Sequence, residues 1–251
     1  MISKPLLKNI IKTNRKSWIN MTIILTVLLL AFLASASAFK GAGTIMISQF
    51  FTMFAVLLPL IYFAGASNRL IAAQVDSGAL AYTMSNPIKR NTVTITSAVF
   101  IISSIIAMFL VITIVGIILV LAMNIMTVGD LLLLCLGALC LCLALSSICF
   151  FASCFFNTSR HSLAVGAGIP VAFFIFRFLS SMFSDIPGMD DNAIAKVMGA
   201  FRYLTLNTLF DANGVMAHSV NMAWQFPFLI VIACIGYAAG VTVFKKKDLP
   251  L

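Results

Sequence analysis

Six long apolar runs alternate with short polar segments along this chain. Each run has about the 20 residues that an α-helix needs to cross the hydrocarbon core of a bilayer. The pattern predicts an all-α integral membrane protein, with one membrane domain over residues 1–251. The six predicted spans are 19–39, 45–66, 93–123, 131–156, 163–183 and 224–244. The third run is longer than one crossing requires, so we expect it to tilt or to project beyond the bilayer.

Residues 1–18 precede the first run and carry a different pattern. On a helical wheel, five apolar residues share one face and five cations share the opposite face. They are Leu6, Leu7, Ile10, Ile11 and Trp18 against Lys4, Lys8, Lys12, Arg15 and Lys16. A helix of this kind lies among the lipid headgroups with its apolar face buried. We therefore predict an N-terminal amphipathic interfacial helix that acts as an orientation anchor, as a mechanical element, or as both.

The same region also resembles a secretory signal peptide. Basic residues and an apolar run are followed by alternating alanine and serine from Ala34 to Ala38, which is typical of a cleavage site. However, the apolar run is longer than the hydrophobic part of a signal peptide, and the basic segment is long and regularly patterned. The sequence therefore favours an uncleaved first span over a cleaved signal.

The composition excludes a water-soluble protein. Hydrophobic residues make up 62% of the chain and charged residues only 9%, too few to cover the surface of a soluble domain. A net charge of +9 would suggest a nucleic-acid partner in a soluble protein. Here, twelve of the sixteen cations fall in the N-terminal segment, the second and fourth interhelical segments and the C-terminal tail. By the positive-inside rule we predict cytoplasmic termini, and no nucleic-acid partner.

The segment 67–92, between the second and third runs, is polar but patterned. Four residues, Leu70, Ile71, Gln74 and Val75, have helical spacing before Gly78 interrupts them. A second short helical piece, with Leu80, Ala81 and Met84, is ended by Pro87, because the residue before a proline avoids the α conformation. Two interpretations remain open: a short cytoplasmic helix held by a partner, or an ordinary solvated loop.

The segment 184–222, between the fifth and sixth runs, is too apolar for a free loop. Its apolar residues include Val197, Met198, Phe201, Leu204 and Leu209. We expect extracellular re-entrant helices here, which are tolerated in a bilayer only where protein buries their polar backbone ends. The alternative is a small extracellular cap.

The sequence offers no catalytic or metal-binding constellation. It has no Gly-x-x-x-x-Gly-Lys-Ser/Thr phosphate loop and no Glu, and His161 and His218 are predicted on opposite sides of the membrane. All six cysteines lie in apolar runs, and Cys135, Cys142 and Cys149 recur every seven residues. We expect them to be packing residues on one helix face. The chain is accordingly not expected to be an enzyme or to bind a cofactor.

Arg177 is the one charge well inside a predicted span. An intramembrane ion often marks a transport path, and Arg177 with Phe174 and Phe178 is a candidate for lining one. The alternatives are that Arg177 reaches the headgroups or pairs with Asp185.

The layout and the segment 67–92 together resemble the type-2 ABC exporter permeases. In that family, the loop between the second and third spans contains an acidic residue, a Gly and Leu-rich residues, and ends in Pro-Ile/Val-Ser-Arg. The matching positions here are Asp76, Gly78, Leu80 and Asn86-Pro87-Ile88-Lys89-Arg90. There are three departures. Gln74 stands where a Glu is common, Ser77 replaces a usual charge, and Ser97 lies in the region of a frequent Lys.

The resemblance implies that 67–92 is a coupling helix seated in a groove of a separate cytoplasmic ABC ATPase, which would bind ATP and Mg. The residues implied in that contact are Asp76, Gly78, Leu80, Met84, Pro87, Lys89 and Arg90. It further implies two permease copies in a bacterial cell membrane, expected as a homodimer, with a heterodimer as the alternative. The second and fifth spans would face the path. An amphipathic peptide, of the toxin or bacteriocin type, is the expected substrate, with drugs, lipids and polysaccharide precursors as alternatives.

Two other classes compete with this interpretation. A stand-alone channel or secondary transporter needs polar groups near the bilayer midplane or internally repeated halves, and beyond Arg177 the sequence shows neither. A membrane enzyme needs an acid–base pair, and none is evident. The sequence therefore favours the exporter permease.

Overall fold

In the computed structural model, the described part of the chain comprises residues 3–38, 43–80, 90–184, 205–216 and 222–247. The regular elements of these ranges are all helical. They are α1 (Lys4–Ala38), α2 (Gly43–Gln49), the π-helical turn η1 (Phe50–Phe54), α3 (Ala55–Leu70), α4 (Ala72–Asp76), α6 (Arg90–Met123), α7 (Val128–Phe155), α8 (Ser159–Ser184), the 3-10 turn η3 (Leu206–Leu209), α10 (Ala212–Met216) and α11 (Met222–Lys246).

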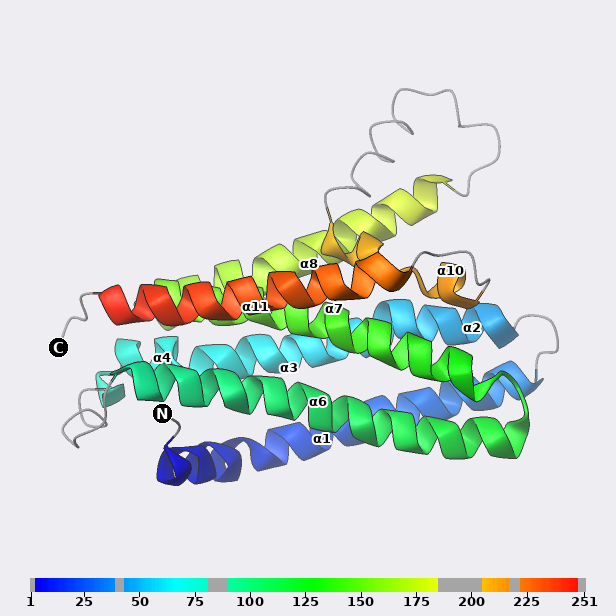
Figure 1. Ribbon diagram of the computed structural model, residues 1–251, viewed down its shortest axis with the longest axis horizontal. Coiled ribbons are helices and arrows are strands. Elements are labelled where there is room, and N and C mark those ends of the chain that lie inside the picture. The colour runs from blue at the N-terminus through cyan, green and yellow to red at the C-terminus, as the bar shows by residue number, and fades with distance from the viewer. Residues whose placement is uncertain (1–2, 39–42, 81–89, 185–204, 217–221, 248–251) are drawn as a thin grey trace.

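Six helical stretches of the described ranges are long and apolar enough to cross a membrane, which confirms an all-α, multi-pass membrane protein. They are Lys4–Ala38, Gly43–Asp76, Arg90–Met123, Val128–Phe155, Ser159–Ser180 and Trp224–Lys246. Figure 1 shows them side by side, with the two termini at the same end. We call this end of the bundle, where α3 ends, α6 begins and α11 ends, the basic end, because it carries Arg69, Arg90 and Lys245.

The first helix shows no boundary at residue 18. Residues 4–38 form one continuous helix, so the predicted interfacial helix and the first span are a single element. Nothing after Pro5 breaks it, and a proline is tolerated in the first turn. One stripe of buried residues runs along the whole helix: Ile10, Asn14, Thr22, Leu25, Leu29, Leu33 and Ala36. This stripe packs largely against α6, and it explains why the basic half continues the same helix.

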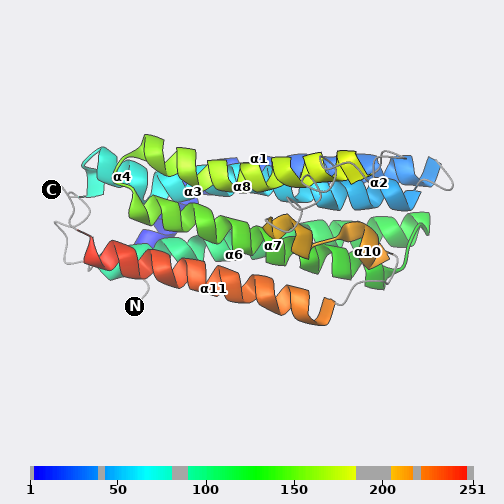
Figure 2. The ribbon, with the colours of Figure 1, turned by 90° about the horizontal axis from the view of Figure 1, so that it is seen from above.

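The helix α7 lies at the centre of the bundle. It contacts α3, α6, α8 and α11, and Figure 2 shows it between α11 on one side and α3 and α8 on the other. Small residues let these neighbours approach closely. A Cβ atom added at Gly236 of α11 would lie 2.8 Å from Ser147 Cβ, and one at Gly166 of α8 would lie 3.2 Å from Ala152 Cβ. Close helix contact of this kind is the usual source of cohesion between membrane helices.

The Cys149 thiol of α7 donates a hydrogen bond to a backbone carbonyl of α8 that a proline leaves without its helical partner. Pro170 lies inside α8, and a proline has no N–H to donate to the carbonyl four residues earlier. That carbonyl belongs to Gly166, and the Cys149 thiol donates a hydrogen bond to it over 3.0 Å. The carbonyl freed by Pro170 is thus satisfied from the neighbouring helix.

The same arrangement recurs seven residues earlier on α7, against α3. Pro59 lies inside α3, and the carbonyl that it leaves unpaired, that of Ala55, accepts a hydrogen bond from the Cys142 thiol over 3.6 Å. The prediction that Cys135, Cys142 and Cys149 are buried packing residues is confirmed, since all three are buried in α7. Their periodicity did not indicate that two of them bond to proline-freed carbonyls.

Candidate functional site

The segment that carries the family-like motif begins with a distorted helix end. α3 continues to Leu70, past the predicted start of the loop at residue 67, and α4 follows after a break at Ile71, where φ is −128° and ψ is −73°. The extension is stabilised by burial, because Ser67 and Asn68 are almost fully covered. The described start of 67–92 is therefore helical and packed, as the helical spacing of Leu70 to Val75 indicated, and it is not a solvated loop. Of the motif positions, Met84, Pro87 and Lys89 lie outside the described residues.

Asp76 bonds to the first residue of α8. Its Oδ2 atom accepts a hydrogen bond from the backbone N–H of Ser159 over 3.1 Å. A carboxylate at a helix N-terminus satisfies an otherwise unpaired N–H group and is favoured by the helix dipole. A second bond lies nearby, where Asn68 Nδ2 donates to Ser159 Oγ over 2.7 Å. The end of α3 and the α4 turn are thus tied to the start of α8 at two points, and neither Asn68 nor Ser159 was predicted from the sequence.

Gly78 has a conformational role. Its φ of +71° lies in the left-handed region, which L-residues other than Gly adopt only at a cost. A Cβ atom added there would meet nothing within 4 Å. The glycine is therefore needed for the direction of the chain and not for close packing.

Leu80, predicted to contact the ATPase, is buried in this chain. Its exposed fraction is 1%, and it belongs to the hydrophobic core. Among the described residues of this segment, those from Asp76 to Ala79 are exposed. Leu80 anchors the end of this turn in the hydrophobic core.

Arg90 also bonds within the chain. It is the first residue of α6, and its Nη1 atom donates to the Lys247 carbonyl over 3.3 Å. Lys247 Nζ donates in turn to the Cys154 carbonyl at the end of α7, over 3.0 Å. Burial lowers the pKa of the Lys247 ammonium, an effect that the nearby Cys154 thiol partly offsets. Arg90 thus helps to join α6, α7 and α11 at the basic end.

Arg177, the second candidate site, joins α8 to the segment that precedes α11. Its Nη1 atom donates to the Asn207 carbonyl over 2.8 Å, and its Nη2 atom lies 3.7 Å from Asp211 Oδ1. The predicted partner Asp185 lies outside the described residues, whereas Asp211 was not singled out. Of the two neighbouring candidates, Phe178 is exposed and Phe174 is half-buried. The guanidinium is therefore used in structural pairing.

Part of the predicted extracellular segment packs against the bundle. α10 contacts α2 and α7, and Phe210 and Val215 are each 1% exposed. Asn213 Oδ1 accepts a hydrogen bond from Ser48 Oγ of α2. The apolar residues of the described part, 205–216, thus contact the membrane helices. Val197, Met198, Phe201 and Leu204 lie outside the described residues, and the depth of the segment in a bilayer stays a prediction.

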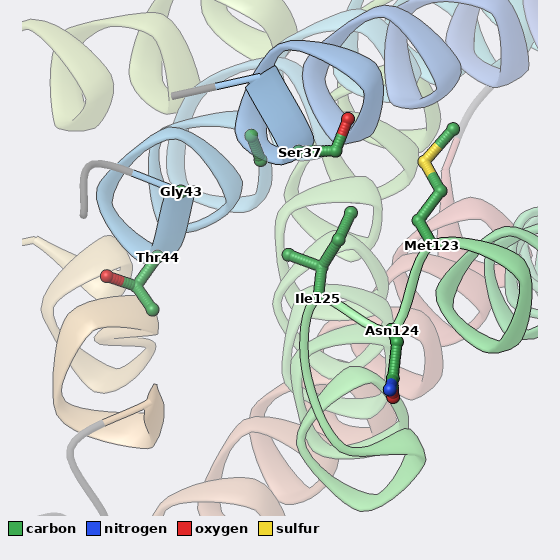
Figure 3. Close-up of a pocket in the computed structure, with 7 residues that line it drawn as sticks. Ser37, Gly43, Thr44, Met123, Asn124 and Ile125 are labelled. Atoms are coloured by element: carbon green, nitrogen blue, oxygen red, sulfur yellow. The ribbon is translucent and has the colours of Figure 1, made fainter. Parts of the chain in front are cut away.

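The end of the bundle opposite the basic end has a pocket of about 350 Å³. It lies where α1 ends, α2 begins and α6 turns towards α7, and Figure 3 shows Ser37, Thr44, Met123 and Ile125 around it. Asn124 closes α6 there, with a φ of 53° and a backbone bond to the Val120 carbonyl. The described lining of the pocket contains no ionisable side chain.

Within the described ranges, no three His, Cys, Asp or Glu side chains lie close enough together to hold a metal ion. No protein-family model matches this sequence, and no curated protein matches it significantly. The geometry of the basic end is therefore the main structural support for a function.

Proposed function

We propose that this chain is the transmembrane permease subunit of an ATP-driven exporter of the type-2 ABC kind. In this proposal, both termini face the cytoplasm of a bacterial cell, and a second permease copy completes the path. A separate ATPase, with ATP and Mg, docks at the basic end and supplies the work. The substrate is an amphipathic or hydrophobic molecule, most simply a peptide.

The observation that carries the proposal is the bond between Asp76 and the start of α8. An exposed turn at residues 76–79 follows α3 through the short helix α4, and Asp76 in it is hydrogen-bonded to α8. A force applied to this turn reaches two membrane helices at once. These helices are the second and fifth spans, which the family resemblance assigns to the two sides of the path. Contiguous contacts of this kind can carry coupling between distant sites.

The residues around Arg177 support an apolar path. Because this guanidinium is bonded to Asn207 and Asp211, the proposal gives it no contact with substrate. The exposed ring of Phe178 on α8 supplies an apolar surface instead. An amphipathic peptide suits a surface of this kind better than an ion or a sugar does.

The decisive experiment replaces Asp76 with alanine in a complex of this chain with its proposed partner ATPase. Loss of a helix cap costs about 1 kcal/mol, equivalent to about a fivefold change in an equilibrium. We expect the complex to assemble and its substrate-stimulated ATP hydrolysis to fall by about fivefold.

The matched control is Asp130→Ala. Asp130 accepts a hydrogen bond from Thr127 at the start of α7, at the opposite end of the bundle. This variant should keep its ATP turnover. Equal turnover in wild type and Asp76→Ala, absence of any complex with the ATPase, or transport by the purified chain alone would each contradict the proposal.

A further inference from the structure

A groove of about 250 Å³ lies between α1 and α3 near the basic end. The two helices run in opposite directions, and a hydrogen bond from Arg69 Nη2 to Asn14 Oδ1, over 3.3 Å, joins them. The groove lies on the side of α1 that Ser17 and Asn20 occupy, while Arg15 lines a separate groove between α1 and α6.

The groove changes from polar to apolar along its length. Ser17, Asn20 and Arg69 line it at the basic end, and Ile24 and Ile61 line it deeper in the bundle. Seven residues separate Ser17 from Ile24, which is about 10 Å along a helix. Ile24 and Ile61 are 49% and 57% exposed, so the apolar part opens sideways towards the bilayer.

The polar groups of the groove have unused hydrogen-bonding capacity. Arg69 makes one side-chain hydrogen bond, to Asn14, although a guanidinium has five N–H donors. No carboxylate of the described ranges forms an ion pair with it. The Tyr62 hydroxyl is buried and has no partner in the same ranges. An unsatisfied buried hydroxyl is unfavourable, so a ligand that brings an acceptor here is stabilised by it.

The charge around the groove selects for an anion. Lys12 and Lys16 are exposed on the same end of α1. Basic residues at the end of a membrane helix attract anionic lipids. A phosphate group also matches the geometry of a guanidinium, which can donate to two of its oxygens.

Gly65 leaves the space open. It lines the groove between Tyr62 and Arg69, and a Cβ atom added there would meet nothing within 4 Å. A larger side chain at this helical position would therefore fill the groove without displacing its walls.

We propose that this groove binds an anionic phospholipid from the leaflet at the basic end. The phosphate lies against Arg69, with Ser17, Asn20 and Tyr62 as further hydrogen-bonding groups. An acyl chain follows the surface of Ile24 and Ile61. The apolar extension distinguishes a lipid from a soluble phosphate, which would use only the polar end. The inference does not depend on the proposed export function.

The test is native mass spectrometry of the full chain in detergent with added phosphatidylglycerol or phosphatidylcholine. The wild type is expected to retain one phosphatidylglycerol about tenfold more strongly than phosphatidylcholine. Arg69→Gln, which keeps a donor for Asn14, should remove this preference, because the charge-assisted bonds to phosphate are lost. Gly65→Leu should reduce retention of the first lipid of either kind by about tenfold.

Two control variants make the result specific. Arg15→Gln removes the same charge from the neighbouring groove, and Gly168→Leu adds the same side chain at an equally open glycine of α8. Both should retain lipid like the wild type. A thermal unfolding midpoint for each variant shows that it is folded. If Gly65→Leu does not fold, Gly65→Ala takes its place, with a smaller decrease expected.

Three outcomes would overturn the proposal. Equal losses in Arg69→Gln and Arg15→Gln would indicate diffuse charge attraction. Unchanged retention in the Gly65 variant would place the lipid elsewhere. Displacement of phosphatidylglycerol by millimolar glycerol phosphate would identify a soluble-anion site.

Discussion

The hydrogen bond from Cys149 to Gly166 allows a direct test of how α7 supports a proline-containing helix. Cys149→Ala removes the thiol and leaves the Gly166 carbonyl buried without a donor. An unsatisfied buried group costs about 1–3 kcal/mol, and a thiol is a weak donor. We therefore expect this hydrogen bond to contribute about 1 kcal/mol to the free energy of unfolding.

The experiment that isolates this contribution is a double-mutant cycle with Pro170→Ala. Alanine at position 170 restores a backbone N–H that can donate to the Gly166 carbonyl, so the thiol becomes redundant. Cys149→Ala should then cost about 1 kcal/mol less in the Pro170→Ala background than in the wild type. Equilibrium unfolding in mixed SDS and non-denaturing micelles, followed by helical circular dichroism, measures the four free energies.

The control is Cys140→Ala, which removes a thiol of the same size from α7. Cys140 is 2% exposed, and the carbonyls freed by Pro59 and Pro170 bond to other cysteines. Its replacement should cost the same in the wild type and in the Pro170→Ala background. If Cys149→Ala also costs the same in both backgrounds, the thiol does not compensate for the proline, and the reasoning is wrong.

Two further predictions concern the ends of the bundle. Arg177→Ala should lower the free energy of unfolding by about 2 kcal/mol, because it removes both the hydrogen bond to the Asn207 carbonyl and the ion pair with Asp211. Asp211→Ala should cost less, because Arg177 keeps its hydrogen bond to that carbonyl. Equal costs in micelle unfolding would contradict this. Gly78→Ala should cost about 1 kcal/mol through its left-handed backbone, whereas Gly168→Ala, at an open helical position, should stabilise by up to about 1 kcal/mol. Thermal midpoints that shift in the same direction for both glycine variants would refute that argument.

The membrane helices were largely predictable because apolar run length is a local signal. The predicted span 131–156 is close to the observed helix Val128–Phe155. The helix starts earlier because Thr127 is its N-cap, and the Thr127 side chain accepts a hydrogen bond from the Asp130 N–H. The prediction was less accurate where tertiary contacts decide the element. α3 continues past residue 67 because Ser67 and Asn68 are buried, and Asn68 finds its partner in Ser159, a residue 91 positions away that no local pattern identifies.

The candidate sites show the same division. The motif drew attention to Asp76 and Gly78, and the structure shows that the first makes a helix cap and the second has a positive φ. Their contact with an ATPase stays a prediction. The motif did not show that Leu80 points into the core. Asp211 as the partner of Arg177 was missed because the two lie far apart in the sequence and in different predicted segments. A proline in an apolar run does predict a backbone carbonyl without its helical hydrogen bond. The sequence does not show which side chain donates to that carbonyl, because this depends on which helix packs against it.

α8 is bonded to other segments at its first residue and again at Arg177, and these contacts limit how it can move. Asp76 holds its first residue, and Arg177 holds it about 27 Å further along, as about 18 residues of helix imply. α8 cannot shift along its axis without breaking one of these contacts. A sideways force would therefore bend the helix between them. Its softest section is the turn at Pro170, where a single sulfur contact replaces a backbone bond. Bending at Pro170 therefore requires less free energy than translation of the whole helix.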